Sequence, residues 1–322
     1  MCDCVLAVTA RAKQDLYFEL CLKGQSEISA RAKYGGYPGL TYPRTPGHEI
    51  VGTIAKLGSQ SHYWKVKQRV GVGWRGGHCM RCKSCLKGDF WACESPLATG
   101  ISSDGGYAEY MVARMEVLTA IPEELSSVEA APLLCAGATT LGALKSSQAK
   151  AGDLIAIHGL GGLGHLAVQF GARLGMKVAV ISRGKEKEVL ARKLGAHIYI
   201  DAKTQSPADE LMKMGGARAI FCTAPNSKAI SELVGGLAHG GEMVIITFVN
   251  EPLQISPIAL MHAVRSVSGW VGGNTADTLN FSVLTHVLPM VEVFPLEQAA
   301  VAFDRMMTAK VRFRAVLTVS EE

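Results

Sequence analysis

The chain has 322 residues, of which 48% are hydrophobic and 19% charged, which suits a globular protein with two domains and excludes a largely disordered one. Its 33 basic and 28 acidic residues leave a net charge of +5 without a long Lys/Arg block, so we expect a phosphate-bearing ligand and no nucleic-acid partner. We find no secretory signal and no apolar run of roughly 20 residues, the length of a membrane span, and therefore expect no membrane partner.

The first part of the chain, residues 1–125, is rich in short runs of β-forming residues broken by glycine and proline. This pattern predicts a mostly-β domain with long functional loops. The expected strands are Val5–Thr9, Ile50–Ala55, Arg69–Val72 and Ala108–Val112.

Four closely spaced cysteines stand within this domain, in the segment 78–94: Cys79, Cys82, Cys85 and Cys93. Four thiolates at this spacing can complete the tetrahedral shell of a structural zinc ion. A ferredoxin-type iron–sulfur run would place its last cysteine sooner and follow it with proline, whereas Glu94 follows here. The site is expected to be architectural, because four protein ligands leave no position for a substrate. The nine cysteines, an odd number, also favour a reducing, cytoplasmic location.

Strands and helices alternate in residues 126–271, which predicts a doubly wound parallel sheet. Residues 272–322 are expected to return to the first domain and to end in the strand Phe313–Val319. The strands expected in the middle region are Asp153–His158, Lys177–Ile181, His197–Ile200, Ala219–Cys222 and Met243–Phe248, and the helices are Leu163–Leu174 and Lys185–Leu194.

A glycine-rich motif follows the first of these strands and opens the first helix. This G-x-G-x-x-G run consists of Gly159, Leu160, Gly161, Gly162, Leu163 and Gly164. In this context the first glycine makes a tight turn, the second lets a pyrophosphate approach the backbone, and the third allows close packing. The helix N-terminus adds positive potential, so the motif predicts dinucleotide binding.

The end of the next strand indicates which dinucleotide is bound. An NAD site carries Asp or Glu there to bond the ribose 2′-hydroxyl, whereas this chain has Ser182 and Arg183, with Lys187 nearby. A hydroxyl and two cations suit a 2′-phosphate, so we expect NADP(H). The alternative is a solvated basic start of the next helix.

Together these features resemble the medium-chain, zinc-dependent alcohol dehydrogenase family. Three further runs carry the resemblance, namely Thr45–Gly52 (TPGHEIVG), Gly105–Tyr110 (GGYAEY) and Ala131–Thr140 (APLLCAGATT), together with the closing segment Phe294–Arg314. The resemblance implies a GroES-like catalytic domain, a Rossmann domain and reversible hydride transfer between NADP(H) and an alcohol/carbonyl pair. It also implies a small-molecule substrate and a homo-oligomer.

The resemblance further implies a catalytic zinc that polarises the substrate oxygen. Its matching residues here are His48 and Cys135, with Glu49 either a ligand or a partner of the ligands. Ser26 matches a proton-relay hydroxyl, Thr139 a residue near the nicotinamide, and Arg314 a residue that reaches the cofactor phosphates. His165, in the first turn of the glycine-rich helix, is expected to be exposed and not catalytic.

The chain departs from the family at the first zinc cysteine, where Gly24 stands in the matching position. Three hypotheses follow. Cys21 could replace the missing ligand and keep a working catalytic zinc. Alternatively, the enzyme reduces C=C or C=N bonds, or an activated carbonyl, without that zinc. In the third hypothesis the short N-terminal region leaves a catalytically impaired NADPH-binding homologue.

Overall fold

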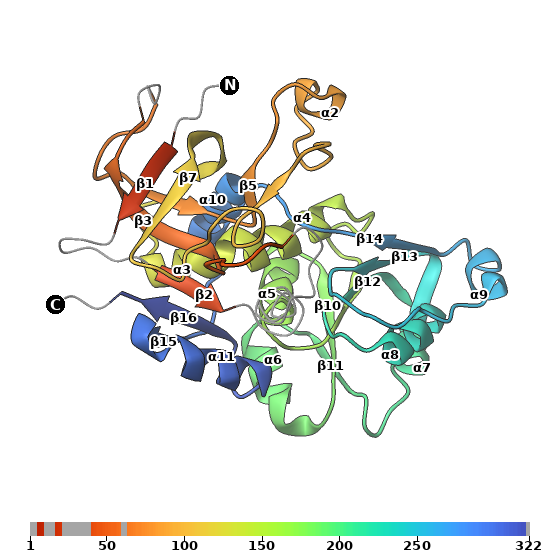
Figure 1. Ribbon diagram of the computed structural model, residues 1–322. Coiled ribbons are helices and arrows are strands. Elements are labelled where there is room, and N and C mark those ends of the chain that lie inside the picture. Colours follow the sequence, from red (N-terminus) through yellow and green to blue (C-terminus); the bar gives the residue numbers. More distant parts are fainter. Residues whose placement is uncertain (1–4, 10–16, 21–39, 59–62, 320–322) are drawn as a thin grey trace. The chain divides into compact units, whose positions relative to one another are not determined.

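The structure is a computed structural model that describes residues 5–9, 17–20, 40–58 and 63–319, the first two ranges as backbone only. The described residues form two compact units, coloured red to yellow with dark blue and green to light blue in Figure 1. Of the described residues, the first unit contains those up to Cys135 and those from Asn274 onward, and the second contains Ala136–Gly273. Helix α3 (Ser127–Pro132), which follows the expected boundary at residue 125, packs on strand β3 (His48–Lys56) and belongs to the first unit.

The first unit is built on a largely antiparallel sheet with the strand order β15-β16-β2-β3-β1-β7, to which β4 is added beside β3 and β8 beside β4. Only β15 and β16 pair in parallel among these strands. The strands are β1 (Val5–Thr9), β2 (Tyr17–Leu20), β3 (His48–Lys56), β4 (Arg69–Val72), β7 (Tyr110–Arg114), β8 (Leu118–Ala120), β15 (Val291–Pro295) and β16 (Arg314–Thr318). The mostly-β prediction is confirmed, although β7 begins two residues later than expected.

A small lobe projects from this unit and carries the four-cysteine segment. It consists of strands β5 (Arg75–Gly77) and β6 (Leu97–Ala98) and the single turn of helix α2 (Lys83–Leu86). The first unit also contains η1 (Met115–Val117), α10 (Thr275–Thr285), η5 (Leu296–Gln298) and α11 (Ala299–Met307). Helix α11 packs on β16, so residues from the end of the chain complete the first unit.

The second unit is a six-stranded sheet with the order β11-β10-β9-β12-β13-β14, and every pair in it is parallel. The doubly wound prediction is confirmed, since the chain proceeds outward from β9 in one direction and from β12 in the other. The strands are β9 (Leu154–His158), β10 (Lys177–Ser182), β11 (Ile198–Asp201), β12 (Ala217–Cys222), β13 (Leu237–Ile245) and β14 (Ser266–Gly269).

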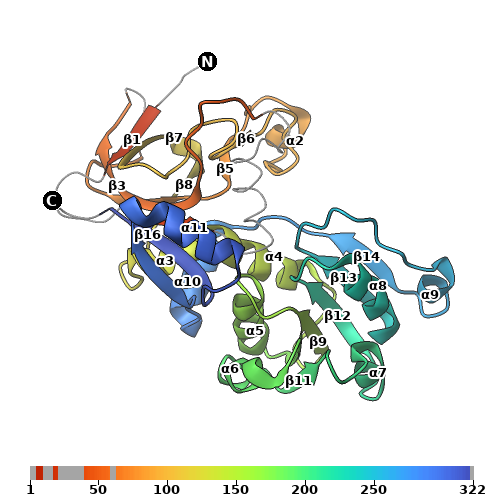
Figure 2. The same cartoon turned by 60° about the horizontal axis from the view of Figure 1, so that its bottom comes forward.

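Helices cover both faces of this parallel sheet, as Figure 2 shows for α5 and for α7 and α8. The strands are therefore continuous apolar runs, because both of their faces are buried. One core cluster contains Ala156, Ile181 and Cys222 from the strands and Leu211 and Ile230 from α7 and α8. The helices are α4 (Ala138–Ser146), α5 (Gly164–Arg173), α6 (Glu188–Lys193) after η3 (Lys185–Lys187), α7 (Pro207–Met212), α8 (Ser227–Leu233) before η4 (Val234–Gly236), and α9 (Pro257–Met261).

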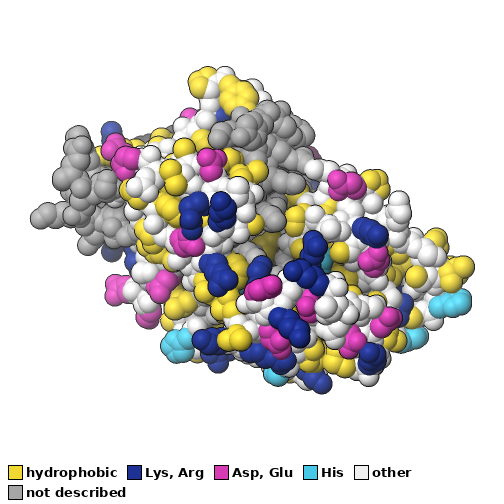
Figure 3. All heavy atoms as spheres, turned by 90° about the horizontal axis from the view of Figure 1, so that it is seen from below, with side chains coloured by type: hydrophobic (Ala, Val, Ile, Leu, Met, Phe, Trp, Pro, Cys, Tyr) yellow, Lys and Arg dark blue, Asp and Glu magenta, His cyan; other side chains and the backbone are white. Residues whose placement is uncertain are grey.

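One helical stretch, Ser127–Ser146, is long and apolar enough to cross a membrane by length and composition. Its most apolar window is 83% buried in the fold, as in the core helix of a globular protein. Figure 3 shows one face of the molecule, on which basic and acidic side chains are interspersed with apolar ones. Among the described residues, this face carries no continuous block of one charge.

Candidate metal and dinucleotide sites

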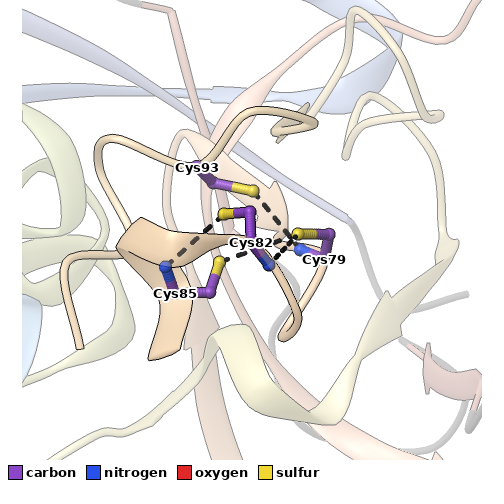
Figure 4. Close-up of side chains that lie close together, drawn as sticks. All are labelled: Cys79, Cys82, Cys85 and Cys93. Atoms are coloured by element: carbon purple, nitrogen blue, oxygen red, sulfur yellow. Dashed lines mark hydrogen bonds between the residues drawn. The ribbon is translucent and has the colours of Figure 1, made fainter. Parts of the chain in front are cut away.

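The four cysteines of the small lobe point toward one another (Figure 4). Their sulfur atoms all lie within 4.8 Å of one another, and Cys79 Sγ is 3.9 Å from Cys85 Sγ. Tetrahedral zinc with Zn–S bonds of about 2.3 Å requires sulfur–sulfur distances of about 3.8 Å. The geometry therefore fits a structural zinc ion held by Cys79, Cys82, Cys85 and Cys93.

Backbone N–H groups point at these sulfur atoms and favour their thiolate forms. Cys82 N–H donates to Cys79 Sγ over 3.3 Å, and Cys79 N–H donates to Cys93 Sγ over 3.4 Å. The backbone N–H groups of Glu94 and Cys85 lower the pKa of the Cys82 thiol to about 6, whereas burial raises the pKa of Cys85 to about 12. Such a mixed set is suited to a cation that neutralises all four thiolates.

A second cluster of metal-ligand type is formed by His48, Glu49 and Cys135 in the first unit. Their ligand atoms also lie within 4.8 Å of one another, and all three residues are buried. Burial lowers the pKa of His48 to about 4, so its imidazole is neutral at pH 7 and has a nitrogen lone pair for a metal. The ring of Trp74 meets the His48 ring edge to face, with the ring centroids 5.1 Å apart.

His48 and Glu49 are held in place because two of the sequence motifs bind each other. The N–H groups of Gly105, Gly106 and Tyr107 donate to the carbonyl oxygens of Thr45, Gly47 and Pro46, respectively, over 2.7 to 3.2 Å. The approach is so close that a Cβ on Gly105 would lie 2.0 Å from the Gly47 carbonyl oxygen. Glu49 itself has a positive φ of 67°, a conformation uncommon for non-glycine residues, and the contacts of this loop hold it.

Cys135 lies within the π-helical turn Leu133–Gly137, which directly follows α3. Helix α3 begins at a capping box, in which the Ser126 side chain accepts from Glu129 N–H and Glu129 reaches back to the Ser126 backbone. A π-turn widens the helix locally and is frequent at functional sites. Here it carries the Cys135 thiol to His48 and Glu49.

Glu49 also forms a fully buried ion pair. Arg314 Nη2 lies 2.6 Å from Glu49 Oε2, and both side chains have zero solvent exposure. Sequence reasoning assigned Arg314 to the cofactor phosphates and did not foresee this partner, because the two residues are 265 positions apart. The phosphate contact of Arg314 stays a prediction.

The glycine-rich loop of the second unit has the geometry that each of its glycines was expected to provide. Gly159 has a φ of 101°, and a Cβ on Gly164 would lie 1.9 Å from the Gly159 carbonyl oxygen. Beside Gly161, by contrast, a Cβ would meet no atom within 4 Å. The loop is therefore closed by its first and third glycines and open at the second. Gly162 and Leu163 complete the turn into α5, with Leu163 buried.

The turn after β10, which carries Ser182 and Arg183, is fixed by two residues of β11. Asp201 Oδ1 accepts from Gly184 N–H over 2.7 Å, and Tyr199 donates its hydroxyl to the Gly184 carbonyl oxygen over 2.5 Å. The carboxylate of Asp201 also accepts from Lys203 N–H, and this bond leads the contacts that lower its pKa. Neither residue was recognised from the sequence.

Lys187 and Arg183 differ in their surroundings. Lys187 Nζ donates to the Leu160 carbonyl oxygen over 3.1 Å and so lies at the glycine-rich loop. Arg183 is exposed, and no hydrogen bond or ion pair joins it to a residue that the structure describes. The Lys187 amine is thus hydrogen-bonded to the loop, while the Arg183 guanidinium is open to solvent.

The remaining predicted residues have mixed outcomes. Thr139 is buried in α4, and no described residue bonds its hydroxyl. The prediction that His165 is exposed is wrong, because its Nδ1 lies 2.9 Å from the Gly161 carbonyl oxygen and the side chain is fully buried. Cys21, Gly24 and Ser26 lie outside the described residues.

Comparisons with known proteins identify the family of the chain. The GroES-like domain of alcohol dehydrogenases matches residues 19–123, and the zinc-binding dehydrogenase domain matches residues 162–286. The alcohol dehydrogenase notN of Aspergillus sp. (strain MF297-2) is 42% identical over 291 residues, which cover 89% of this chain and 86% of that protein. An alcohol dehydrogenase of Geobacillus stearothermophilus is 37% identical over 302 residues, 92% of this chain and 89% of that protein.

Two solved structures are similar over almost the whole chain. A cinnamyl alcohol dehydrogenase of Sorghum bicolor (SbCAD4) has a TM-score of 0.84 at 27% identity and covers 97% of this chain and 89% of its own. The CAD of Helicobacter pylori, complexed with NADP(H), has a TM-score of 0.84 at 25% identity, with 97% and 90% covered. The matches support a nucleotide cofactor and zinc in general terms. The chain therefore belongs to the medium-chain, zinc-dependent alcohol dehydrogenase family and is an oxidoreductase with a GroES-like and a Rossmann-type domain.

Proposed function

We propose that this protein interconverts an alcohol and the matching aldehyde or ketone, using NADP(H) and a catalytic zinc ion. The observation that carries the proposal is the buried cluster of His48, Glu49 and Cys135, whose ligand atoms lie within 4.8 Å of one another. In the oxidation, the alcohol carbon gives a hydride to NADP⁺ and the hydroxyl gives up a proton, which leaves the carbonyl product and NADPH. A zinc ion held by this cluster would act as a Lewis acid toward the substrate oxygen.

The donor set fits zinc, because a neutral imidazole, a thiolate and a carboxylate are all zinc ligands. His48 and Cys135 would hold the ion from β3 and from the π-helical turn. Glu49 would complete three protein ligands or orient the other two from its ion pair with Arg314. Cys21 as a substitute ligand and Ser26 as the proton relay belong to this proposal as predictions from the sequence.

NADP(H) is the preferred cofactor in this proposal. The hydroxyl of Ser182, the exposed guanidinium of Arg183 and the Lys187 ammonium at the glycine-rich loop support it. No carboxylate stands at the end of β10, where an NAD enzyme would bond the ribose 2′-hydroxyl. Thr139 near the nicotinamide and Arg314 near the phosphates are further parts of the proposal.

A second candidate function is the reduction of C=C or C=N bonds without catalytic zinc. The Glu49–Arg314 ion pair favours it, because a carboxylate held by a buried guanidinium is a weaker third ligand. In that case NADPH gives its hydride to the double bond and solvent supplies the proton.

The zinc content of the purified protein tests the first proposal. We expect about two zinc ions per chain, and about one in the Cys135→Ser variant, because only the structural site would remain filled. A Cys93→Ser variant controls for the structural site. About one zinc in both the parent and Cys135→Ser, with turnover of conjugated enones or imines that resists chelators, would support the second candidate instead. Cofactor binding without turnover of any substrate would indicate an impaired homologue.

We also propose a cytoplasmic location and a homo-oligomer. The six described cysteines form no disulfide, which suits a reducing compartment. The edge strand β14 leaves Ser266, Ser268 and Gly269 exposed, and Trp270 and Val271 follow it at the surface. An open edge with apolar neighbours can pair with the same edge of a second copy.

A further inference from the structure

Three buried side chains of the second unit have polar atoms without a hydrogen-bond partner among the described residues. They are Thr139 Oγ1, His158 Nδ1 and Thr247 Oγ1. An unsatisfied buried group costs about 1–3 kcal/mol, so each of them calls for an explanation. Thr139 is already assigned to the cofactor, whereas nothing in the proposed function uses His158 or Thr247.

His158 is the last residue of β9 and directly precedes the glycine-rich loop. Its cross-strand partners are Ile181 in β10 and Cys222 in β12, and side chains in register on parallel strands share one face of the sheet. Its carbonyl oxygen accepts from the N–H and hydroxyl of Thr223, which fixes the backbone. The residue is only 8% exposed, and burial lowers the pKa of its imidazole to about 4, so at pH 7 the ring is neutral with one donor and one acceptor nitrogen.

Thr247 stands two residues beyond the end of β13 and is 9% exposed. Strand β12 separates β13 from β9 in the sheet, as Figure 2 shows, so the two strand ends are about 10 Å apart. Both residues therefore lie at the carboxyl edge of the sheet, on either side of the point where the strand order reverses. Open parallel sheets bind dinucleotides across this point.

We propose that His158 and Thr247 hydrogen-bond NADP(H) directly, His158 at the adenosine half and Thr247 at the nicotinamide half. The inference rests on the proposed cofactor. The assignment of each residue to one half of the cofactor follows from the strand order. The 2′-phosphate of the adenosine half is expected at the end of β10, which lies next to β9. The other half then extends over β12 and β13. A neutral imidazole suits an edge of the adenine ring, and a threonine hydroxyl suits a ribose hydroxyl or the carboxamide.

Calorimetric titration of the full-length protein with NADPH and with adenosine 2′,5′-bisphosphate, which lacks the nicotinamide half, separates the two roles. The variants are His158→Phe and the near-isosteric Thr247→Val, with His239→Phe, an exposed histidine of β13, as the control. We expect His158→Phe to weaken both ligands by about tenfold, the value of one net hydrogen bond. Thr247→Val should weaken NADPH by a similar factor and leave the bisphosphate unchanged, and His239→Phe should affect neither.

The melting temperature of the unliganded protein provides a second measurement. Because neither polar atom has a protein partner among the described residues, both variants should melt no lower than the parent. If His158→Phe does not fold, His158→Leu replaces it, and Thr247→Val tests the proposal independently. Parent-like affinities of both variants for both ligands would overturn this inference but not the proposed cofactor. Failure of the parent to bind either ligand would instead overturn the proposed cofactor.

Discussion

Arg183 is the residue on which the choice of cofactor depends most directly. It is exposed at the end of β10, and no described residue bonds it, so a 2′-phosphate would be its main partner. We expect Arg183→Asp to weaken NADPH binding by about tenfold to a hundredfold, since it replaces a charge-assisted bond by repulsion. The same variant should bind NADH more tightly, through the ribose 2′-hydroxyl.

The measurement is the ratio of kcat/KM for NADPH and NADH in both proteins. Arg173→Asp is a matched control, because Arg173 stands at the last turn of α5 and takes no part in the proposed site. An unchanged NADPH/NADH ratio of kcat/KM in Arg183→Asp would show that the end of β10 does not bind the 2′-phosphate.

The buried ion pair between Glu49 and Arg314 makes a second prediction at this scale. Removing one partner leaves an uncompensated buried charge, which typically costs about 3–5 kcal/mol. Burial lowers the pKa of Arg314 to about 9, and Glu49 supplies the counter-charge of this desolvated guanidinium. We therefore expect Arg314→Met to lower the free energy of unfolding by about this amount in urea denaturation.

The double variant Glu49→Gln/Arg314→Met is the control, because it leaves no isolated charge. It should recover a large part of the lost stability. If the single variant is as stable as the parent, the ion pair is not a structural element of the first unit.

At the scale of the element, two glycines of the glycine-rich loop are expected to have different roles, Gly164 in folding and Gly161 in NADPH binding. A Cβ on Gly164 would collide with the Gly159 carbonyl oxygen, whereas a Cβ on Gly161 would enter open space. Gly164→Ala should therefore destabilise the second unit by roughly 1–3 kcal/mol, the usual cost of overpacking. Gly161→Ala should fold like the parent and lose about tenfold or more in NADPH affinity, because its methyl group would occupy the pyrophosphate position.

Thermal melting and NADPH fluorescence titration of the two variants check this prediction. The two substitutions are chemically identical and only three residues apart, so each is the control for the other. Equal losses of stability in both would contradict the assignment of the open side to the pyrophosphate.

The sequence predicted most of the regular elements, and its errors have local causes. Strand β7 starts at Tyr110 rather than Ala108, because the residues before it hydrogen-bond with Thr45–Gly47. Strand β13 begins at Leu237, six residues before the expected start, since it continues past Gly240 despite the positive φ of 67° there. The glycine pair Gly240–Gly241 is here part of an irregular strand.

The candidate sites were predicted as far as their residues lie in local motifs. The four cysteines and the glycine-rich loop are each contained in one segment, so spacing alone identified them. The Glu49–Arg314 pair, the support of Gly184 by Asp201 and the position of Thr247 depend on contacts between distant segments. Such contacts exist only in the folded chain, and spacing along the sequence does not encode them.

At the scale of the whole molecule, the open edge of the second sheet is the surface at which we propose that copies of the chain associate. Among the described strands β14 pairs only with β13, and Val271, just beyond it, is 57% exposed. In a two-fold dimer formed at this edge, each residue near the axis faces its own copy. In a Val271→Lys variant, the two substituted side chains would therefore repel each other across the interface.

We therefore expect the parent to elute as a dimer of 34.3 kDa chains, with Val271→Lys dissociating at a concentration about tenfold higher or more. Light scattering coupled to size-exclusion chromatography over a dilution series measures this. Val189→Lys is the matched control, since Val189 is 68% exposed on α6, away from β14. A parent that is monomeric at every concentration, or equal behaviour of the two variants, would place the association elsewhere or exclude it. If Val271→Lys alone dissociates and still binds NADPH, the edge strand serves assembly and the carboxyl edge of the same sheet serves the cofactor.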